Sequence, residues 1–339
     1  MFCFYYNYLT LPLYIVTCYK YIYISNLMGS QTQPKILVVD LCNENLKPGT
    51  STWISTCNEI RQAMEDTGCF EAIYNKIPLE LHNEIFKAAD ELFDLPIETK
   101  MQNTSDKPYH EYFGQYTGIP LYESLAIDDP TNLTATQSFT DRMWPNGNPP
   151  FCESVHSFAK IIVEVDQLVM RMIMESYGIE KYYDSHIETS NYLLRFFKYR
   201  KPEINEHNVG LYPHTDKNMV SIIHQNHING LQIKAKDGEW IDLEPSPSSF
   251  VIMAADGLLA WSNGRIRSCE HQVIINAHET RYSMGLFSFN RGIVHIPEEF
   301  VDELHPLRYR PFDIYEFLRF HDSDEGKKTD GSITSFCGI

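Results

Sequence analysis

The chain has 339 residues, of which 43% are hydrophobic and 13% aromatic, and its formal charge at pH 7 is −17. This length is sufficient for one large or two modest hydrophobic cores. Proteins that bind nucleic acids need clustered Lys and Arg side chains to displace counterions, and no basic stripe is visible. The composition therefore argues against a nucleic-acid partner and favours a small-molecule substrate.

The eight cysteines are dispersed, and no C-x-x-C pair is present. This spacing supports neither a zinc knuckle nor a thioredoxin-type motif. Dispersed single cysteines are typical of proteins in a reducing compartment. We therefore expect a cytoplasmic protein.

Residues 1–27 differ from the rest of the chain because they are rich in Tyr, Phe and Leu. No cation precedes their apolar part, as a signal peptide requires, and several polar residues and Pro12 interrupt a membrane span. We expect the protein proper to begin at Met28 and residues 1–27 to be a non-native or unstructured extension. A hydrophobic anchor is the alternative, although no membrane contact is expected.

Residues 28–180 form the predicted helical N-terminal region. Apolar residues recur at helical spacing in three segments, for example Trp53, Ile54, Cys57, Ile60 and Met64 in the first. The expected elements are a strand over 35–41, helices over 53–66, 79–93 and 151–177, and long loops over 102–150.

From residue 191 the pattern changes to short strands with turn signals at intervals of about ten residues. Such a pattern is typical of antiparallel barrels and sandwiches. We predict an α+β fold in which the helical region packs on a double-stranded β-helix (a jelly-roll, cupin-like core) over residues 181–320. A short helix near 311–320 ends this domain, and residues 321–339 form a C-terminal tail.

A metal-binding pattern lies within the strand-rich half. His214 and Asp216 are two residues apart, so in an extended segment both side chains point to one face. His271 is positioned on a later strand to supply a third ligand. Two His and one carboxylate form the facial triad of non-haem Fe(II) oxygenases, which leaves positions on the metal open.

Other histidines fit this pattern less well. The triplets His82-Asn83-Glu84 and His186-Ile187-Glu188 fall in or near predicted helices, where we expect surface pairs. We expect His224 and His227 to be hydrogen-bonded or solvent-facing histidines.

Ten residues after His271, Arg281 and Ser283 again share one face of a strand. The planar guanidinium matches a carboxylate, and the hydroxyl adds a donor. Together they suit the distal carboxylate of a dicarboxylic acid. An isolated Arg-x-Ser would instead be a surface pair at the end of a strand.

The segment from GLYPHTDKNMVSIIHQ to RYSMGLFSF contains H-T-D, N-G-L-Q-I, D-G-E-W-I and W-S-N-G-R, followed by the H…R-x-S spacing. It resembles the plant 2-oxoglutarate/Fe(II)-dependent dioxygenases, and the similarity extends from about residue 35 to the C-terminus. ETKMQNTSDKPYHEYFGQ, MWPNGNPPFC and the closing FCGI are most similar to the clade of AOP-type glucosinolate side-chain dioxygenases and steroidal glycoalkaloid hydroxylases.

The resemblance implies that His214, Asp216 and His271 bind Fe(II) and that Arg281, Ser283 and Tyr199 bind 2-oxoglutarate. Two positions depart from the family pattern: Phe197 replaces a common Asn, and Gln272 replaces the usual Arg after the second histidine. Neither departure removes an expected metal ligand. The aromatic residues of PYHEYFGQY are candidates for lining a substrate pocket or for packing a loop.

The resemblance, together with these features, implies a monomeric dioxygenase that hydroxylates a small plant specialised metabolite, uses O2 and 2-oxoglutarate, releases succinate and CO2, and takes ascorbate as reductant. Three alternatives remain open at this point: a related Fe(II) oxidase that does not use 2-oxoglutarate, a desaturase or dealkylase, and an inactive binding protein. Substrate-dependent succinate release separates the first alternative, and iron binding tests the last.

Overall fold

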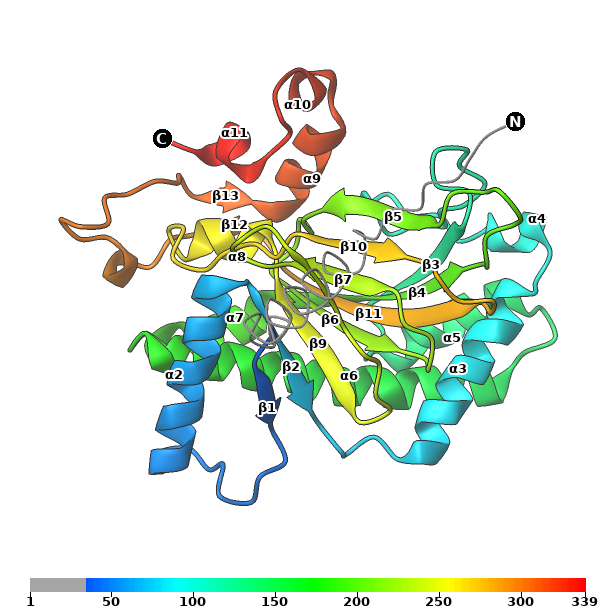
Figure 1. The fold of residues 1–339 in the computed structure, drawn as a ribbon, viewed down its shortest axis with the longest axis horizontal. Coiled ribbons are helices and arrows are strands. Elements are labelled where there is room, and N and C mark those ends of the chain that lie inside the picture. Colours follow the sequence, from blue (N-terminus) through cyan, green and yellow to red (C-terminus); the bar gives the residue numbers. More distant parts are fainter. Residues whose placement is uncertain (1–34) are drawn as a thin grey trace, which may run out of the picture. The chain divides into compact units, whose positions relative to one another are not determined.

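In the computed structural model, which describes residues 35–339, a seven-stranded sheet forms the centre of the fold (Figure 1). Its strands lie in the order β1-β2-β9-β6-β11-β4-β3, and every neighbouring pair except β1–β2 is antiparallel. The strands are β1 (Val38–Asp40), β2 (Cys69–Ile73), β3 (Tyr122–Asp128), β4 (Ser190–Tyr199), β6 (Val220–Gln225), β9 (Ser249–Ala254) and β11 (Arg281–Asn290).

A four-stranded antiparallel sheet in the order β5-β10-β7-β8 faces the larger sheet. Its strands are β5 (Val209–His214), β7 (Leu231–Lys234), β8 (Trp240–Asp242) and β10 (His271–Ile274). The two sheets enclose a small apolar core that includes Leu231, Ile233 and Val273. A separate pair, β12 (Ile293–Val294) and β13 (Phe312–Asp313), lies near the C-terminus.

Helices cover the other face of the larger sheet. The long helix α6 (Pro149–Ser176) contacts β6 and β11 and is itself contacted by α2 (Ser51–Asp66), α3 (Leu79–Phe93) and α5 (Leu133–Met143) (Figure 1). The Asn148 side chain caps its first turn by accepting from the Phe151 amide. The remaining helices are α4 (Ile97–Lys100), α7 (Tyr183–Thr189), α8 (Asp256–Trp261), α9 (Ile314–Asp322), α10 (Asp324–Lys328), α11 (Ile333–Cys337) and the 3-10 turns Glu180–Tyr182 and Glu298–Phe300.

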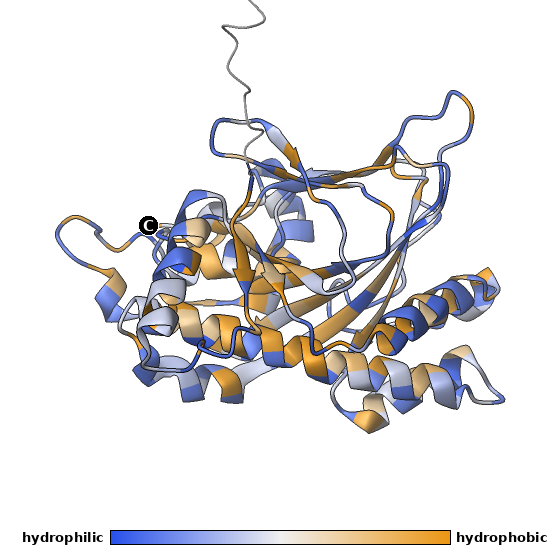
Figure 2. Ribbon diagram, turned by 60° about the horizontal axis from the view of Figure 1, so that its bottom comes forward, coloured by the Kyte–Doolittle hydropathy of each residue, from blue (hydrophilic) through white to orange (hydrophobic). Residues whose placement is uncertain are grey.

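The main hydrophobic core fills the space between these helices and the larger sheet. Hydrophobic residues concentrate on the strands and on the helix faces next to them, whereas the connecting loops are mostly hydrophilic (Figure 2). Along β4 and β11, alternate residues such as Phe196, Met284 and Leu286 point toward the helices and are fully buried. The intervening residues face the smaller sheet.

The predicted fold class is confirmed, and the three long helices lie where the apolar spacing placed them. The interpretation of residues 102–150 as loops was wrong, because β3 and α5 lie within them. The polar and turn-forming residues that flank these two short elements obscured their patterns. Ile54 was also misplaced, since 55% of its surface is exposed and it lies on the outer side of α2.

The predicted surface positions of His82 and His186 were also wrong. Both side chains are buried, and His82 Nδ1 lies 2.9 Å from His224 Nε2 between α3 and β6. Tertiary packing placed polar side chains in the interior, where they found partners that helical spacing does not show. His224 is hydrogen-bonded as expected, and the largely exposed His227 lies 3.4 Å from Glu279.

Residues 36–339 form one compact unit, and the predicted extension 1–27 lies outside the described residues. Among the helices of residues 35–339, none combines the length and the apolar character needed to cross a bilayer. The described cysteines are all free thiols.

Candidate metal and co-substrate site

The smaller sheet brings the three predicted metal ligands together. His214 ends β5 and His271 begins β10, and the antiparallel register places them directly opposite each other. Asp216 follows β5 by two residues. One ligand atom from each side chain lies within 4.8 Å of the other two, and the two imidazole centroids are 4.2 Å apart.

The orientation of both imidazoles suits metal binding. His214 Nδ1 lies 2.8 Å from the Tyr212 carbonyl oxygen, and His271 Nδ1 lies 3.1 Å from the Cys269 carbonyl oxygen. Because a carbonyl only accepts, each Nδ1 carries the proton and each Nε2 keeps its lone pair. These Nε2 atoms lie 3.6 and 3.8 Å from the Asp216 carboxylate oxygens, a spacing that leaves room for an ion between them.

The protonation states of His271 and Asp216 match the same role. Burial lowers the pKa of His271 to about 4, so its imidazole is neutral near pH 7. Burial alone would raise the pKa of Asp216, but the two imidazoles and the Ser221 hydroxyl hold it well below its usual range. An ionised carboxylate and a neutral imidazole are the states in which these two side chains bind a divalent metal.

Ser221 was not predicted from the sequence. Its hydroxyl on β6 donates to Asp216 Oδ2 at 2.6 Å and so fixes the orientation of the carboxylate. Asp256 supports the same turn, because it accepts from Lys217 Nζ at 2.9 Å and its amide donates to the Asp216 carbonyl. Spacing gave no signal for Ser221, since it becomes a neighbour of Asp216 only through the turn after β5.

Arg281 and Ser283 lie on the same face of β11, where the strand faces the smaller sheet. The guanidinium of Arg281 is almost fully buried and donates to Ser283 Oγ at 3.1 Å and to Gln225 Oε1 at 2.6 Å. Its Nε–H has no acceptor, and no carboxylate of residues 35–339 forms an ion pair with it. A buried cation without a counter-ion is costly, so this position suits the carboxylate of a bound molecule.

Tyr199 lies beside this guanidinium, with 5.1 Å between Arg281 Cζ and the centroid of the phenol ring. Gly230 of the N-G-L-Q-I segment packs against Arg281 from the opposite sheet, and a Cβ there would lie 3.1 Å from Arg281 Cδ. Gln225, which the sequence did not suggest, is paired with Ser283 by the β6–β11 register. The predicted co-substrate residues therefore lie together.

A cavity of about 510 Å³ joins these two groups of residues. It is lined by all three predicted metal ligands, by Arg281, Ser283 and Tyr199, and by Tyr109 and Phe113 from the loop before β3. Phe197, which replaces the common Asn, contributes an apolar wall. Gln272 lies outside the lining and donates to Gln232 Oε1 at 2.7 Å.

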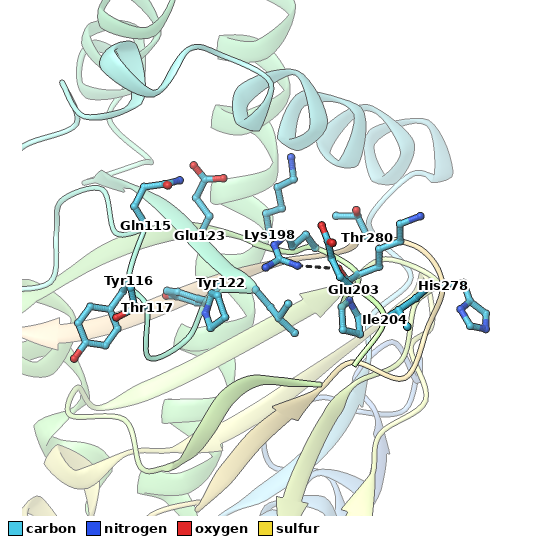
Figure 3. Close-up of a pocket in the computed structure, with 15 residues that line it drawn as sticks. Gln115, Tyr116, Thr117, Tyr122, Glu123, Lys198, Glu203, Ile204, His278 and Thr280 are labelled. Carbon is cyan, nitrogen blue, oxygen red and sulfur yellow. Dashed lines mark hydrogen bonds between the residues drawn. The ribbon is translucent and has the colours of Figure 1, made fainter. Parts of the chain in front are cut away.

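A second hollow, of about 990 Å³, lies where β3 and β4 meet the loop that follows β4 (Figure 3). Its lining includes Tyr116, Lys198, Glu203 and His278 but none of the six predicted site residues. The predicted metal and co-substrate residues therefore all line the smaller cavity between the two sheets.

Two family models match the chain. Residues 181–290 match the 2OG-Fe(II) oxygenase superfamily, and residues 38–145 match the N-terminal region of non-haem dioxygenases in morphine synthesis. The first match contains both groups of predicted site residues. The second covers β1, β2 and β3 and the helices α2 to α5.

Known proteins resemble the chain over most of its length. A protein of Arabidopsis thaliana named probable 2-oxoglutarate-dependent dioxygenase AOP1.2 is 42% identical over 310 residues, which are 89% of this chain and 95% of that protein. The dioxygenase for auxin oxidation 1 of Arabidopsis thaliana, solved with 2-oxoglutarate, has a TM-score of 0.72 and 27% identity over 80% of this chain and 99% of its own. The rice dioxygenase for auxin oxidation has a TM-score of 0.75 and 25% identity over 90% of this chain and 100% of its own.

The chain belongs to the 2OG-Fe(II) oxygenase superfamily, within the plant AOP-type 2-oxoglutarate-dependent dioxygenases. It is thus an oxidoreductase that uses Fe(II) and 2-oxoglutarate, and the predicted class is confirmed.

Proposed function

We propose that this enzyme hydroxylates a small plant specialised metabolite in the inter-sheet cavity. In this proposal His214, Asp216 and His271 hold Fe(II), and Arg281, Ser283 and Tyr199 hold 2-oxoglutarate. One observation supports the assignment most strongly. The buried Arg281 guanidinium, which donates to the Ser283 hydroxyl, lines the same cavity as the three converging metal ligands.

The protein's own residues bind and orient the reactants. The Arg281 guanidinium and the Ser283 hydroxyl bind the distal carboxylate of 2-oxoglutarate, and the Tyr199 ring supports the guanidinium from one side. Ser221 and the Tyr212 and Cys269 carbonyls hold the three ligands in position. The apolar walls Phe197 and Phe287 exclude water from this end of the cavity.

Bound Fe(II) supplies the redox chemistry that couples reduction of O2 to oxidation of both organic molecules. The balance is substrate–H plus O2 plus 2-oxoglutarate, giving substrate–OH, succinate and CO2. A different placement of the substrate C–H bond would give desaturation or dealkylation on the same scaffold.

The proposal also covers the localisation, oligomeric state and reductant of the enzyme. It acts as a cytoplasmic monomer without a nucleic-acid partner, and ascorbate keeps its iron reduced. The dispersed free cysteines support a reducing compartment, and the net charge of −17 argues against a nucleic-acid partner.

Asp216→Ala tests the assignment. The variant removes the anionic ligand from the three, so Fe(II)-dependent formation of succinate from 2-oxoglutarate should fall to background. Its circular dichroism and melting temperature should stay near those of the wild type. Asp141→Ala, which removes an exposed carboxylate on α5, is the matched control and should keep full succinate formation. Wild-type succinate output from Asp216→Ala would refute the metal site.

A further inference from the structure

A second buried guanidinium lies in the inter-sheet cavity, and neither the metal site nor the co-substrate site uses it. Arg195 is on β4, on the same face as Phe197 and Tyr199, and only 8% of its surface is exposed. No carboxylate of residues 35–339 forms an ion pair with it. Its charge is therefore buried without a counter-ion.

Three of its five N–H bonds have acceptors. Nη1 donates to the Ser124 hydroxyl at 2.6 Å, and Nη2 donates to the carbonyl oxygens of Tyr109 and, at 3.2 Å, Glu111. The Tyr122 hydroxyl lies beside the guanidinium, which opposes the rise that burial causes in the pKa of this phenol. These neutral partners orient the guanidinium and hold the loop before β3 against it, but they leave the positive charge uncompensated.

Arg195 and Arg281 lie at separate positions along the larger sheet. In the β4–β11 register Tyr199 is opposite Arg281, whereas Arg195 is opposite Gly285. Four residues of strand correspond to roughly 13 Å. A 2-oxoglutarate held between Arg281 and the metal ligands therefore leaves Arg195 free for another anion.

The residues around Arg195 indicate which other chemical groups a bound anion should have. The neighbouring lining residues Leu193, Phe289, Ile119 and Leu318 are apolar. Of the charged lining groups outside the metal and co-substrate sites, Lys217 is paired with Asp256 at 2.9 Å, and Glu111 contacts Arg195 through its carbonyl oxygen but forms no ion pair with it. Besides Arg281, the cavity thus offers a second uncompensated cation, Arg195, next to an apolar wall.

We propose that Arg195 binds the carboxylate of an organic-acid substrate whose apolar body lies against these walls. The inference deepens the proposed function, on which it rests, by naming the class of substrate. The N–H bonds of Arg195 that have no acceptor can donate to a carboxylate in a charge-assisted hydrogen bond, and a neutral amide of the same shape lacks the charge that would stabilise the buried cation.

Binding to the full-length protein tests the proposal without turnover. Isothermal titration under nitrogen, with Mn(II) and 2-oxoglutarate present, compares phenylacetate, indole-3-acetate and 4-phenylbutyrate with their primary amides. At least one acid should bind about tenfold or more tightly than its amide. Wild-type protein that binds both members of every pair equally, or binds none, overturns the proposal.

Arg195→Gln should reduce the affinity for that acid to the level of its amide while leaving 2-oxoglutarate affinity unchanged. Lys198→Gln is the matched control, since it removes a cation three residues along β4 that lines the other hollow (Figure 3). This control should keep the preference for the acid. An acid preference that survives in Arg195→Gln contradicts the inference.

Arg195→Lys covers the case in which the glutamine variant does not fold. It keeps the charge but loses the hydrogen bonds to Ser124 and to the Tyr109 and Glu111 carbonyls that fix the position of the guanidinium, so the acid should bind more weakly than to wild type yet still better than the amide. Complete loss of the preference in a folded Arg195→Lys, or no change at all, overturns the proposal.

Succinate formation by the wild type with Fe(II) and 2-oxoglutarate alone reports on the proposed function separately. If that succinate forms but no acid preference exists, only the substrate class is wrong.

Discussion

The two faces of the larger sheet are built from the same strands but have different tasks. On the helix-facing side of β4 and β11, Phe196, Met284 and Leu286 are fully buried in the main core. On the other side, Arg195, Tyr199 and Arg281 line the cavity. Because side chains alternate along a strand, one residue step separates a side chain that stabilises the fold from one that contacts a ligand. Stability and chemistry can therefore be changed independently, and four predictions test this separation.

The largest expected effect is on the helix-facing side. Leu286→Ala removes a fully buried side chain and leaves a cavity under α6. The free energy of unfolding should fall by about 2–5 kcal/mol, as measured by urea denaturation. Activity per folded molecule should stay near wild type. The control on the opposite face, Ser283→Ala, should lower stability far less and weaken 2-oxoglutarate binding. Equal losses of stability in both variants would show that the faces are not separate.

The next effect concerns the cavity side. Arg281→Lys replaces the planar fork with a single ammonium, so the Kd for 2-oxoglutarate should rise on the order of a hundredfold. Titration with Mn(II) present measures this change. Arg200→Lys, near the end of β4 and paired with Glu206 at 2.6 Å outside the cavity, is the matched control and should leave the Kd unchanged. An unaltered Kd in Arg281→Lys would remove Arg281 from the co-substrate site.

A smaller effect is expected from the hydroxyl that supports the metal ligand. Ser221→Ala removes the donor 2.6 Å from Asp216 Oδ2, and Fe(II) affinity should fall about 10- to 100-fold. Ser288→Ala removes a buried hydroxyl from the helix-facing side of β11 and should keep iron affinity. If both variants bound iron like the wild type, Asp216 would not depend on Ser221 for its orientation.

The smallest effect is a pH dependence on the helix-facing side, where His82 and His224 form a buried pair. Burial lowers the pKa of both, and that of His224 to about 4. Between pH 6.5 and 4 the unfolded chain therefore binds more protons than the folded protein, so stability falls as the pH falls. Each such histidine contributes up to about 1.4 kcal/mol per pH unit.

His224→Gln should flatten the stability curve over this range relative to wild type, as measured by urea denaturation at several pH values. His227→Gln, an exposed histidine near the same strand, should leave the curve unchanged. A slope that is identical in all three proteins would mean that the buried pair does not titrate in this window.

The sequence predicted helices correctly and indicated candidate site residues wherever the pattern lies within a single helix or extended segment. The apolar spacing of residues 79–93 predicted α3, which has those bounds, and α6 begins within two residues of its predicted start. The pairs His214 with Asp216 and Arg281 with Ser283 are readable because residues two apart in an extended segment share one face, although Asp216 itself lies just after the end of β5. The elements β3 and α5 were missed because many of their residues are polar and turn-forming residues flank them, so neither gives a clear apolar period.

The sequence by itself determined the fold class, the oxygenase family and six candidate site residues, since these depend on periodicity and on motifs within single segments. Only the tertiary structure decided which distant segments meet. The β5–β10 register places His271 opposite His214, the turn after β5 brings Ser221 to Asp216, and the pairing of β3 with β4 buries Arg195 beside Ser124. Strand register is selected by the packing of the whole sheet, so residues that become neighbours through it leave no mark in the spacing along the chain.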